Sequence, residues 1–491
     1  MTIAQILLKR TTSRCPVCHA SVPAEVWKVS EGNGARVFLR RNCPEHGFAE
    51  ACIASDARFY WLAQGDPKNQ CCGGNACSAS DGEVRGTLGR NASGVAEPAE
   101  GQAGMEKLST CLALIEIVNS CNLACPTCYA DSPTGALDAV PLADVQRRIQ
   151  GVIDRKGRIE ILQLSGGEPT LHPQFFELLA WLHAHPGIDY VLLNTNGVRI
   201  ANDDAFLASL GQTFRAGKFQ LYLQFDGVQE AAQRALRGGD LREMRKRAIE
   251  RCGTLNIPIT LAMTVTPENL PHLWDTVEFG LGFDHVRGVS FQPMFGSGRV
   301  PYLSHRPHSS SAHAPNGKDG TNVPHTSLNT ADVILALVAQ SASRLRFDDF
   351  TPLPCCDPNC ATIGYLLKIG GVVGQTRSIS DFVDFRQVQD FLRDKVRYTP
   401  EDLACCGCES EPLGELLHEL ETGMKGGAAA AQFKTPDSAS KLGAAAFRLF
   451  IKPFMDAWTW DEDRIDRCCT HVIRPDGKLD SFCRYYANAR P

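Results

Sequence analysis

The sequence has no run of about 18 consecutive apolar residues, the length that a membrane-spanning helix requires. It also has no secretory signal, because Lys9 and Arg10 follow a short apolar run instead of preceding a long one. These two absences exclude the common routes into or across a membrane. We therefore expect a cytoplasmic protein, in which thiols stay reduced.

The chain also lacks a large excess of positive or negative charge. The formal net charge is −5 at pH 7, and Lys and Arg form no long block. Such a chain provides no extended basic surface, so we exclude nucleic acid as a partner. With 491 residues the chain exceeds the size of a single hydrophobic core, which predicts a main domain with smaller additions.

Cysteine, by contrast, is abundant, with 21 residues that mostly occur in groups. In a large cytoplasmic chain, grouped thiols indicate metal sites and not a disulfide scaffold. The odd count fits metal ligands and one spare residue better than paired bridges. Cys252 is isolated inside a helical pattern, so we predict that it is this spare residue of the core.

Residues 1–70 contain the first cysteine group, and we predict that they form a metal-binding ribbon. A Cys-x2-Cys pair and a Cys-x2-His pair at ribbon spacing supply four ligands for zinc or a single iron, without which so small a piece would not fold. Cys52 is a rival fourth ligand, and ordinary buried cysteines are the alternative reading. The four candidate ligands are Cys15, Cys18, Cys43 and His46.

Residues 71–110 read as a cysteine-rich loop followed by a flexible insertion. The tract 78–107 is rich in Gly, Ala, Ser and Glu and has no apolar period, which predicts a surface excursion. Vicinal cysteines beside glycines can wrap a cluster, unless they are inert buried thiols, and Cys111 is a further candidate ligand. The candidate ligands in the loop are Cys71, Cys72 and Cys77.

Residues 111–345 alternate between strand and helix patterns, which predicts an α/β fold with a parallel sheet. About six such units leave the sheet as a partial (β/α)6 TIM-like barrel, whose chemistry lies at the C-terminal ends of its strands. The predicted strands are 113–118, 159–164, 190–194, 220–225, 259–265 and 289–294. The predicted helices are 142–153, 175–182, 204–210, 241–255, 270–280 and 330–341.

Residues 303–329 are polar and unperiodic, which predicts an inserted loop whose four histidines (His305, His308, His313 and His325) are solvated and not metal ligands. Residues 346–491 are again rich in cysteine, far beyond what packing needs. We predict that they form an auxiliary iron–sulfur domain. Its candidate ligands are Cys355, Cys356, Cys360, Cys405, Cys406, Cys408, Cys468, Cys469 and Cys483.

The central motif is Cys121, Cys125 and Cys128, three thiols at x3 and x2 spacing directly after the first strand of the barrel. Each thiolate can bind one iron of a cubane cluster, which leaves a fourth iron open to a small molecule. Alone, the trio also fits a ferredoxin-like or zinc loop. Its position decides, because this strand end is where such a barrel places its active site.

This trio resembles the signature of the radical S-adenosylmethionine (SAM) superfamily, in which an aromatic residue, here Tyr129, accompanies the cysteines. Three further motifs follow in the order of that family, each at the end of a predicted strand. The resemblance implies a [4Fe–4S] cluster with an open iron, and SAM contacts from Gly166, Gly167, Glu168, Asn194, Asn196, Gln224 and Asp226. It also implies that SAM splits into methionine and a 5′-deoxyadenosyl radical that abstracts a substrate hydrogen, so no general base is nominated.

Motifs on both sides of the barrel include Cys-Pro-Glu-His-Gly at 43–47, Pro-Leu-Pro-Cys at 352–355 and Arg-Cys-Cys-Thr-His at 467–471. They resemble those of a narrower group, the archaeal tetraether lipid synthases and the dihydropterin methyltransferases related to them. This resemblance implies auxiliary iron–sulfur clusters, a rubredoxin-like metal site and C–C bond formation or methylation on a lipid-like or pterin-like substrate. An electron donor such as flavodoxin or ferredoxin is the implied partner, and a lipid substrate would add peripheral membrane contact. A lipid also predicts an apolar tunnel, for which Val289–Phe295 and Phe447–Trp460 are candidates, with a place in the core as the alternative.

Two other functions fit parts of the sequence. Auxiliary clusters also occur in radical SAM enzymes that modify peptides, but residues 15–46 do not read as a peptide-docking module. An iron–sulfur electron-transfer protein without its own substrate would explain the cysteines but not the SAM motifs. We therefore favour a radical SAM enzyme.

Overall fold

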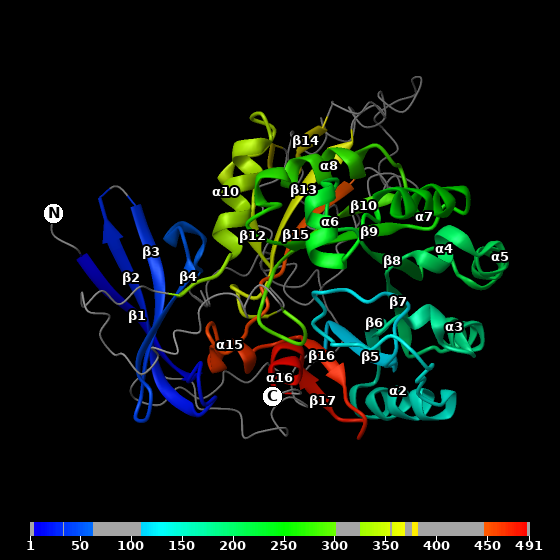
Figure 1. Cartoon of the computed structure of the whole chain (residues 1–491), viewed down its shortest axis with the longest axis horizontal. Helices are drawn as coiled ribbons and strands as arrows, with labels where there is room; N and C mark the ends of the chain where they lie inside the picture. The colour runs from blue at the N-terminus through cyan, green and yellow to red at the C-terminus, as the bar shows by residue number, and fades with distance from the viewer. Residues whose placement is uncertain are drawn as a thin grey trace, which may run out of the picture.

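The computed structural model describes residues 4–32, 34–61, 110–300, 325–353, 356–368, 376–381 and 446–488. Two sheets organise these residues, a smaller one at the N-terminus and a larger one that carries the candidate active site (Figure 1). No helix among them is long and apolar enough to cross a membrane.

The N-terminal sheet is an antiparallel meander, drawn in blue in Figure 1. Alternate residues on its strands, such as Val26 and Leu39, are buried in a small core, as the period of two along a strand requires. The two-residue strand β11 (His325–Thr326) extends its edge. The four long strands are β1 (Ala4–Arg14), β2 (Ser21–Glu31), β3 (Gly34–Cys43) and β4 (Gly47–Ala54).

Six parallel strands form the centre of the larger sheet, in the order β10-β9-β8-β7-β6-β5. Each of the six predicted strands overlaps one of them, and the predicted parallel array is confirmed. The strands are β5 (Leu112–Val118), β6 (Ile159–Gly166), β7 (Ile188–Thr195), β8 (Phe219–Gln224), β9 (Ile259–Val265) and β10 (Val286–Pro293).

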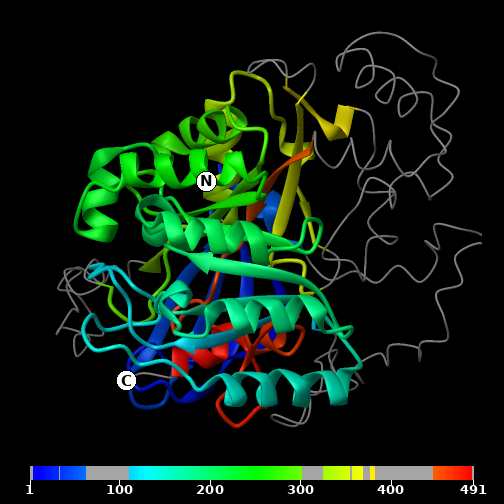
Figure 2. The ribbon, with the colours of Figure 1, turned by 90° about the vertical axis from the view of Figure 1, so that its right-hand side faces the viewer.

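Helices cover the outer face of this sheet, as Figure 2 shows. Their apolar sides pack on outward strand residues such as Leu221 and Leu223, which have no exposed surface. Cys252 is buried in the same core, as predicted for the spare cysteine. The helices are α2 (Leu142–Lys156), α3 (Phe175–Ala184), α4 (Val198–Asn202), α5 (Asp204–Thr213), α6 (Glu230–Arg237), α7 (Arg242–Thr254), α8 (Leu273–Leu281) and α10 (Thr330–Gln340), with 3-10 turns η1 (Ala57–Phe59), η2 (Pro169–Leu171), η3 (Leu270–His272), η4 (Phe347–Asp349) and η5 (Ile379–Asp381).

C-terminal segments complete both edges of the barrel. β15 pairs in parallel with β10, and β16 pairs in parallel with β5, so neither end of the six-stranded array is left open. The region that we predict to be an auxiliary domain therefore contributes strands to the barrel sheet itself. Its elements are β12 (Thr351–Pro352), β13 (Thr362–Lys368), β14 (Thr376–Ser378), β15 (Ala446–Ile451), α15 (Glu462–Ile465), β16 (Thr470–Ile473), β17 (Leu479–Ser481) and α16 (Phe482–Asn488).

Candidate active site

The cysteine trio lies in a loop directly after β5, held by backbone hydrogen bonds at both ends. The Cys121 N–H donates to the carbonyl of Pro133 at 2.9 Å. Cys128 and Arg299 exchange two backbone hydrogen bonds of 2.9 Å each. All three cysteines line one large cavity. The loop therefore presents its thiols to that cavity from a fixed backbone.

The glycine pair after β6 packs against this loop more tightly than any side chain allows. A Cβ atom on Gly166 would lie 2.1 Å from the carbonyl oxygen of Val118, and one on Gly167 would lie 2.0 Å from that of Ser120. Gly166 also has a φ of +122°, which favours glycine. The close approach that requires these glycines is thus to the chain's own backbone, beside the predicted contact with SAM.

Glu168 ties the ends of β6 and β7 together. Its carboxylate accepts hydrogen bonds from the Thr195 hydroxyl at 2.7 Å and from the Asn196 N–H at 2.8 Å. The Thr170 hydroxyl donates a third, at 2.6 Å. Burial raises the pKa of Glu168, although these donors oppose the shift. Glu168 also lines the cavity, so it can orient a ligand there while it fixes the strand ends.

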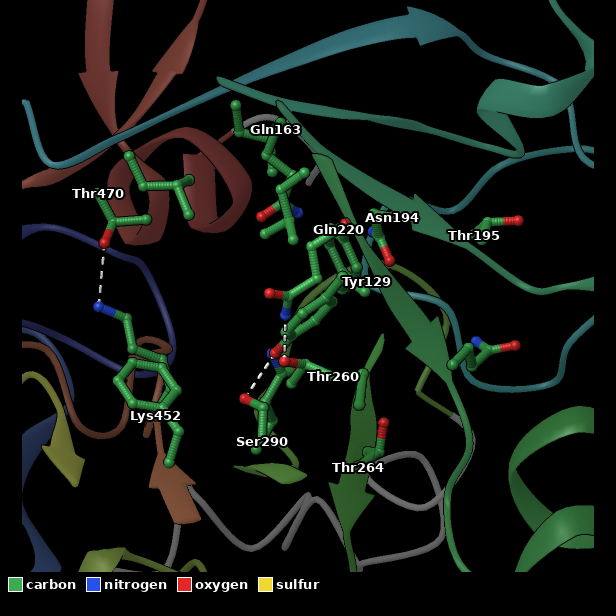
Figure 3. A pocket seen from close by; sticks show the side chains of 18 of the residues that line it. Tyr129, Gln163, Asn194, Thr195, Gln220, Thr260, Thr264, Ser290, Lys452 and Thr470 are labelled. Carbon is green, nitrogen blue, oxygen red and sulfur yellow. Dashed lines mark hydrogen bonds between the residues drawn. The ribbon is translucent and has the colours of Figure 1, made fainter. Parts of the chain in front are cut away.

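The two asparagines of the third strand end point into the site. The Asn194 amide donates to the Ser165 hydroxyl at 3.1 Å, and the Asn196 amide donates to Asn122 in the cysteine loop at 2.7 Å. Figure 3 shows Asn194 among the side chains that line the cavity. Asn196 thus links β7 to the loop that carries the trio.

Asp226 forms a buried ion pair with Arg237, and Arg237 in turn contacts the cysteine loop. Both carboxylate oxygens accept hydrogen bonds from Arg237, at 2.7 and 2.8 Å, and Arg245 adds a third contact at 3.2 Å. Burial acts to raise the pKa of Asp226, but the two guanidinium groups lower it to about 2. Arg237 also donates to the carbonyl of Thr127 in the cysteine loop, at 3.0 Å.

Gln224 is held by the same arginine network, since its side-chain oxygen accepts a hydrogen bond of 2.7 Å from Arg245. The predicted contacts of Gln224 and Asp226 with SAM stay predictions, and the structure assigns both residues a role in positioning. Arg237 and Arg245 were not identified from the sequence. Arg245 lies in the predicted helix 241–255 and Arg237 precedes it; both read as ordinary charged surface, and only the fold turns them inward.

Tyr129 fills the space behind the trio. Its ring packs edge-on against Tyr486 with 4.9 Å between centroids, and its hydroxyl shares a hydrogen bond of 3.3 Å with Ser165. Burial raises the pKa of the phenol. Tyr486 in turn donates to Glu116 on β5 at 2.8 Å, so α16 is anchored beside the cysteine loop.

The cavity has a volume of about 810 Å³ and extends between the sheet and the C-terminal segments. Inward-facing amides and hydroxyls form a row across the strands, and Figure 3 shows Gln163, Gln220, Thr260 and Ser290 in that row. This row was not identified from the sequence. Its signal is the alternation of polar residues with buried leucines, as in Gln220–Gln224, which places every second side chain inside the barrel.

The described C-terminal cysteines gather around one buried lysine. The Lys452 ammonium donates to the Cys360 sulfur at 3.2 Å and to the Thr470 hydroxyl at 3.0 Å. Burial opposes its charge, but Cys360 and the neighbouring Cys356, Cys469 and Cys468 raise its pKa. Cys111 joins this region through a backbone hydrogen bond of 3.0 Å to Cys469, and the Cys483 sulfur accepts one of 3.4 Å from Met455.

Three cysteines of this C-terminal group, Cys111, Cys356 and Cys469, line the same cavity as the trio. Other predicted ligands lie outside the described residues, as do the tract 78–107, most of the loop 303–329 and three of its histidines. The ligands concerned are Cys71, Cys72, Cys77, Cys355, Cys405, Cys406 and Cys408.

In the ribbon, the four predicted ligands come together. The ligand atoms of Cys15, Cys18, Cys43 and His46 all lie within 4.8 Å of one another, a spacing that suits one tetrahedral ion. A hydrogen bond with His46 lowers the pKa of Cys43 to about 6. Cys52 lies apart from them, packed on Val29 and Phe38, so it is not a rival ligand.

Comparison with known proteins places these features in a family. A model of the radical SAM superfamily matches residues 115–280, which begin inside β5 and include the trio and all three supporting motifs. Residues 115–280 form a radical SAM domain. A model described as the HMPTM N-terminal zinc ribbon domain matches residues 7–55.

Two curated relatives extend the comparison. The chain is 25% identical to 7,8-dihydro-6-hydroxymethylpterin dimethyltransferase of Methanocaldococcus jannaschii, over 97% of this chain and 93% of that protein. It is 30% identical to GTP 3′,8-cyclase of Synechococcus elongatus over 34% of this chain, and it spans about half (50%) of that enzyme's length. Among solved structures, SuiB of Streptococcus suis bound to S-adenosylmethionine aligns with a TM-score of 0.30 and 18% identity, over 38% of this chain and 40% of that one.

The residues of the radical SAM domain fit an iron–sulfur cluster better than a single ion. Of the described residues, only the ribbon group brings three or more ligand atoms within 4.8 Å, so the sulfurs of the trio are spread more widely. Burial raises the pKa of Cys121 to about 11 and also raises that of Cys125, so thiolates here need a bound cation. When bound, the cluster supplies the electron that splits SAM into methionine and a 5′-deoxyadenosyl radical.

Proposed function

We propose that this radical SAM enzyme transfers methyl groups to a pterin-like heterocycle. In this proposal Cys121, Cys125 and Cys128 hold the cluster, and the strand ends at Glu168 and Asn196 hold SAM. The observation that carries the proposal is the row of amides and hydroxyls in the cavity, which presents both hydrogen-bond donors and acceptors to a substrate.

The composition of the cavity favours a heterocycle with several polar edge atoms. Gln163 and Gln292 each bring a carbonyl and an NH2 group to this lining, and such groups can pair with ring nitrogens and exocyclic groups of a pterin. Gln292 is already oriented, because it donates to the Tyr222 hydroxyl at 2.6 Å. The relative from Methanocaldococcus jannaschii, which aligns nearly end to end, carries a pterin methyltransferase name and supports the same substrate class.

C–C bond formation on a lipid, the alternative, has less support. Most of the stretch Val289–Phe295 lines the cavity, but Phe291 lies in the core, and Ser290 and Gln292 make this part of the lining polar. Residues 447–454 divide in the same way, since Phe450 lines the cavity and Phe447 is buried behind it. Polar side chains thus interrupt the apolar lining in both stretches, whereas a long acyl chain would need a continuous apolar tunnel.

The chain's residues would act by placement and exclusion of water. Tyr129 and its aromatic neighbours close the cavity behind the trio, and the amide row fixes one face of the substrate. No residue is assigned as a general base. An electron donor is required, because radical SAM enzymes depend on a reductant.

The proposal is tested with anaerobically reconstituted protein, dithionite, SAM and 6-hydroxymethyl-7,8-dihydropterin. We expect 5′-deoxyadenosine or S-adenosylhomocysteine to form together with a methylated pterin, detected by mass spectrometry. Cleavage of SAM without a change in the pterin would reject the substrate class but keep the enzyme class.

Cys125→Ala and Cys252→Ala make a matched pair for the site. We expect Cys125→Ala to abolish SAM cleavage and remove the iron of one cluster, since a cluster ligand is lost. Cys252 is a buried core residue without a predicted metal role, so its variant should keep both. Full activity in Cys125→Ala would overturn the assignment of the trio.

A further inference from the structure

Two arginines line the end of the cavity that lies farthest from the cysteine trio. Arg287 stands at the start of β10, and Arg448 lies on the adjacent strand β15. The two strands run in parallel, and Gly288 is the direct partner of Arg448. The guanidinium groups therefore enter the same cavity from neighbouring positions.

Acidic side chains are few in the lining of this cavity. Among the described residues that line it, the only acidic ones are Glu168 and Asp226, both at the C-terminal ends of strands. Asp226 is already paired with arginines, and Glu168 already accepts hydrogen bonds from hydroxyl and amide donors. The negative charge of Asp284 also acts on Arg287, but Asp284 does not line the cavity. Among the described lining residues, no carboxylate therefore accompanies the two arginines at their end of the cavity.

The two arginines repel each other. Burial lowers the pKa of Arg287, and the neighbouring charge of Arg448 lowers it further. An anion bound between them would relieve both effects, because it would replace lost hydration and offset the like-charge repulsion.

Polar neighbours hold this end of the cavity in place. Arg448 donates to the side-chain oxygen of Gln220 at 3.3 Å, and the Tyr190 hydroxyl donates to the same oxygen at 3.2 Å. Gln220 is also a member of the amide row. The arginine pair is therefore connected directly to the residues that we propose to bind the heterocycle.

The arginine pair lies far along the barrel from the cysteine trio and the SAM motifs. From Arg287 to Pro293 the chain advances six residues along β10, about 20 Å at the usual rise of a strand. The trio and the SAM motifs lie at the C-terminal end of that path, and the amide row lies between. A substrate in the row has one side toward SAM and the other toward the arginines.

We propose that Arg287 and Arg448 bind a phosphoryl group carried by the substrate, on the side of the heterocycle away from SAM. This inference rests on the proposed function and refines its substrate to a phosphorylated pterin-like compound. Two guanidinium groups match the charge and the several oxygens of a phosphate better than a single carboxylate.

The test measures binding of 6-hydroxymethylpterin and of its phosphate ester to the reconstituted enzyme, followed by pterin fluorescence. We expect the ester to bind about tenfold more tightly or better, because each charge-assisted contact adds affinity. Arg287→Gln and Arg448→Gln should bind the two compounds equally, whereas the Arg→Lys variants should keep part of the preference. Arg344→Gln, outside the cavity, is the control for folding and should retain the full preference.

Two further probes separate the sources of failure. Inorganic pyrophosphate should compete with the ester in wild type but not in the arginine variants. If pyrophosphate binds in this arginine-dependent way and no pterin binds, the anion site stands and the pterin proposal fails. Equal affinity for ester and alcohol in wild type would overturn the anion site, as would tighter binding of 6-carboxypterin than of the ester.

Discussion

At the scale of single residues, Asp226 has a structural role that its position in a strand-end motif does not indicate. It has a φ of +63°, a conformation that aspartate tolerates better than most residues, and this turns its carboxylate back under the cysteine loop. There it holds Arg237 and Arg245 in the barrel interior. A fully buried ion-pair network thus adds to the backbone hydrogen bonds that hold the loop.

We expect Asp226→Asn to destabilise the protein by about 3–5 kcal/mol, since two buried guanidinium groups would lose their counter-charge. Urea unfolding followed by circular dichroism measures this. Asp144→Asn is the control, because its partner Arg147 is exposed and such pairs contribute about 0–1 kcal/mol. Equal effects of the two variants would contradict the role of Asp226.

The pH dependence of this ion pair has a definite sign. Because the pKa of Asp226 is lowered to about 2 in the folded protein, below the value of about 3.9 in an unfolded chain, its stabilising effect is present above about pH 4. The contribution is lost as the pH falls from about 4 towards 2. In Asp226→Asn this component of acid sensitivity should be absent from the unfolding profile.

Gly167 provides a second prediction at this scale. Gly167→Ala places a Cβ atom 2.0 Å from a backbone oxygen that cannot move aside without displacing the cysteine loop. We expect a loss of about 3 kcal/mol or more in stability and weaker SAM binding, measured by thermal unfolding and equilibrium dialysis. Gly239→Ala is the matched control, because nothing lies within 4 Å of the position that its Cβ atom would take.

At the scale of elements, the ribbon sheet and its metal ligands form a separate unit. The four ligands sit at the β1–β2 and β3–β4 connections, with Cys43 as the last residue of β3, and the apolar core behind them is small. We therefore expect the fold of this piece to depend on the ion. The matching family model describes a zinc ribbon, which favours zinc over iron.

We expect Cys15→Ser to lose about one zinc ion per chain and to unfold the ribbon, while the iron of the cysteine trio stays. Elemental analysis and hydrogen exchange of residues 4–54 measure the two effects. Cys52→Ser is the control, since Cys52 is equally buried but packs on Phe38 away from the ligands. Loss of zinc from both variants would mean that simple core damage releases the ion.

At the scale of the whole molecule, distant segments meet around one cavity. The ribbon contacts the C-terminal region, where Lys9 forms ion pairs of 2.7 Å with Asp461 and 3.0 Å with Asp463. Arg14 lies over the ring of Trp460 at 4.2 Å. The same C-terminal region supplies β15, β16 and Lys452. The ribbon therefore packs against the segments that form one side of the active-site cavity (Figure 1).

We expect Lys9→Met to loosen the ribbon from the barrel, because the buried carboxylate of Asp461 would lose its cation, at a cost of about 3 kcal/mol. Limited proteolysis between the two units should become faster. Arg10→Met is the neighbouring control, since its ion pair with Glu25 is exposed. Unchanged proteolysis in Lys9→Met would show that other contacts carry the interface.

The sequence by itself determined the barrel and its reacting end. Alternating strand and helix patterns have strong periods, and parallel strands bring all their C-terminal ends to one edge, so the trio, Glu168, Asn196 and Asp226 had to converge. The ribbon ligands could be named for a similar reason, because short Cys-x2-Cys and Cys-x2-His turns fix their own geometry locally.

Only the tertiary structure decided what surrounds the trio. Arg237 and Arg245 turn inward because of how α6 and α7 pack, and Lys452 reaches Cys360 across 92 positions in the sequence. β15 and β16 join opposite edges of the barrel although both come from the last fifty residues. Such contacts depend on which strand edges are left unpaired after the array has folded, and no local period encodes that.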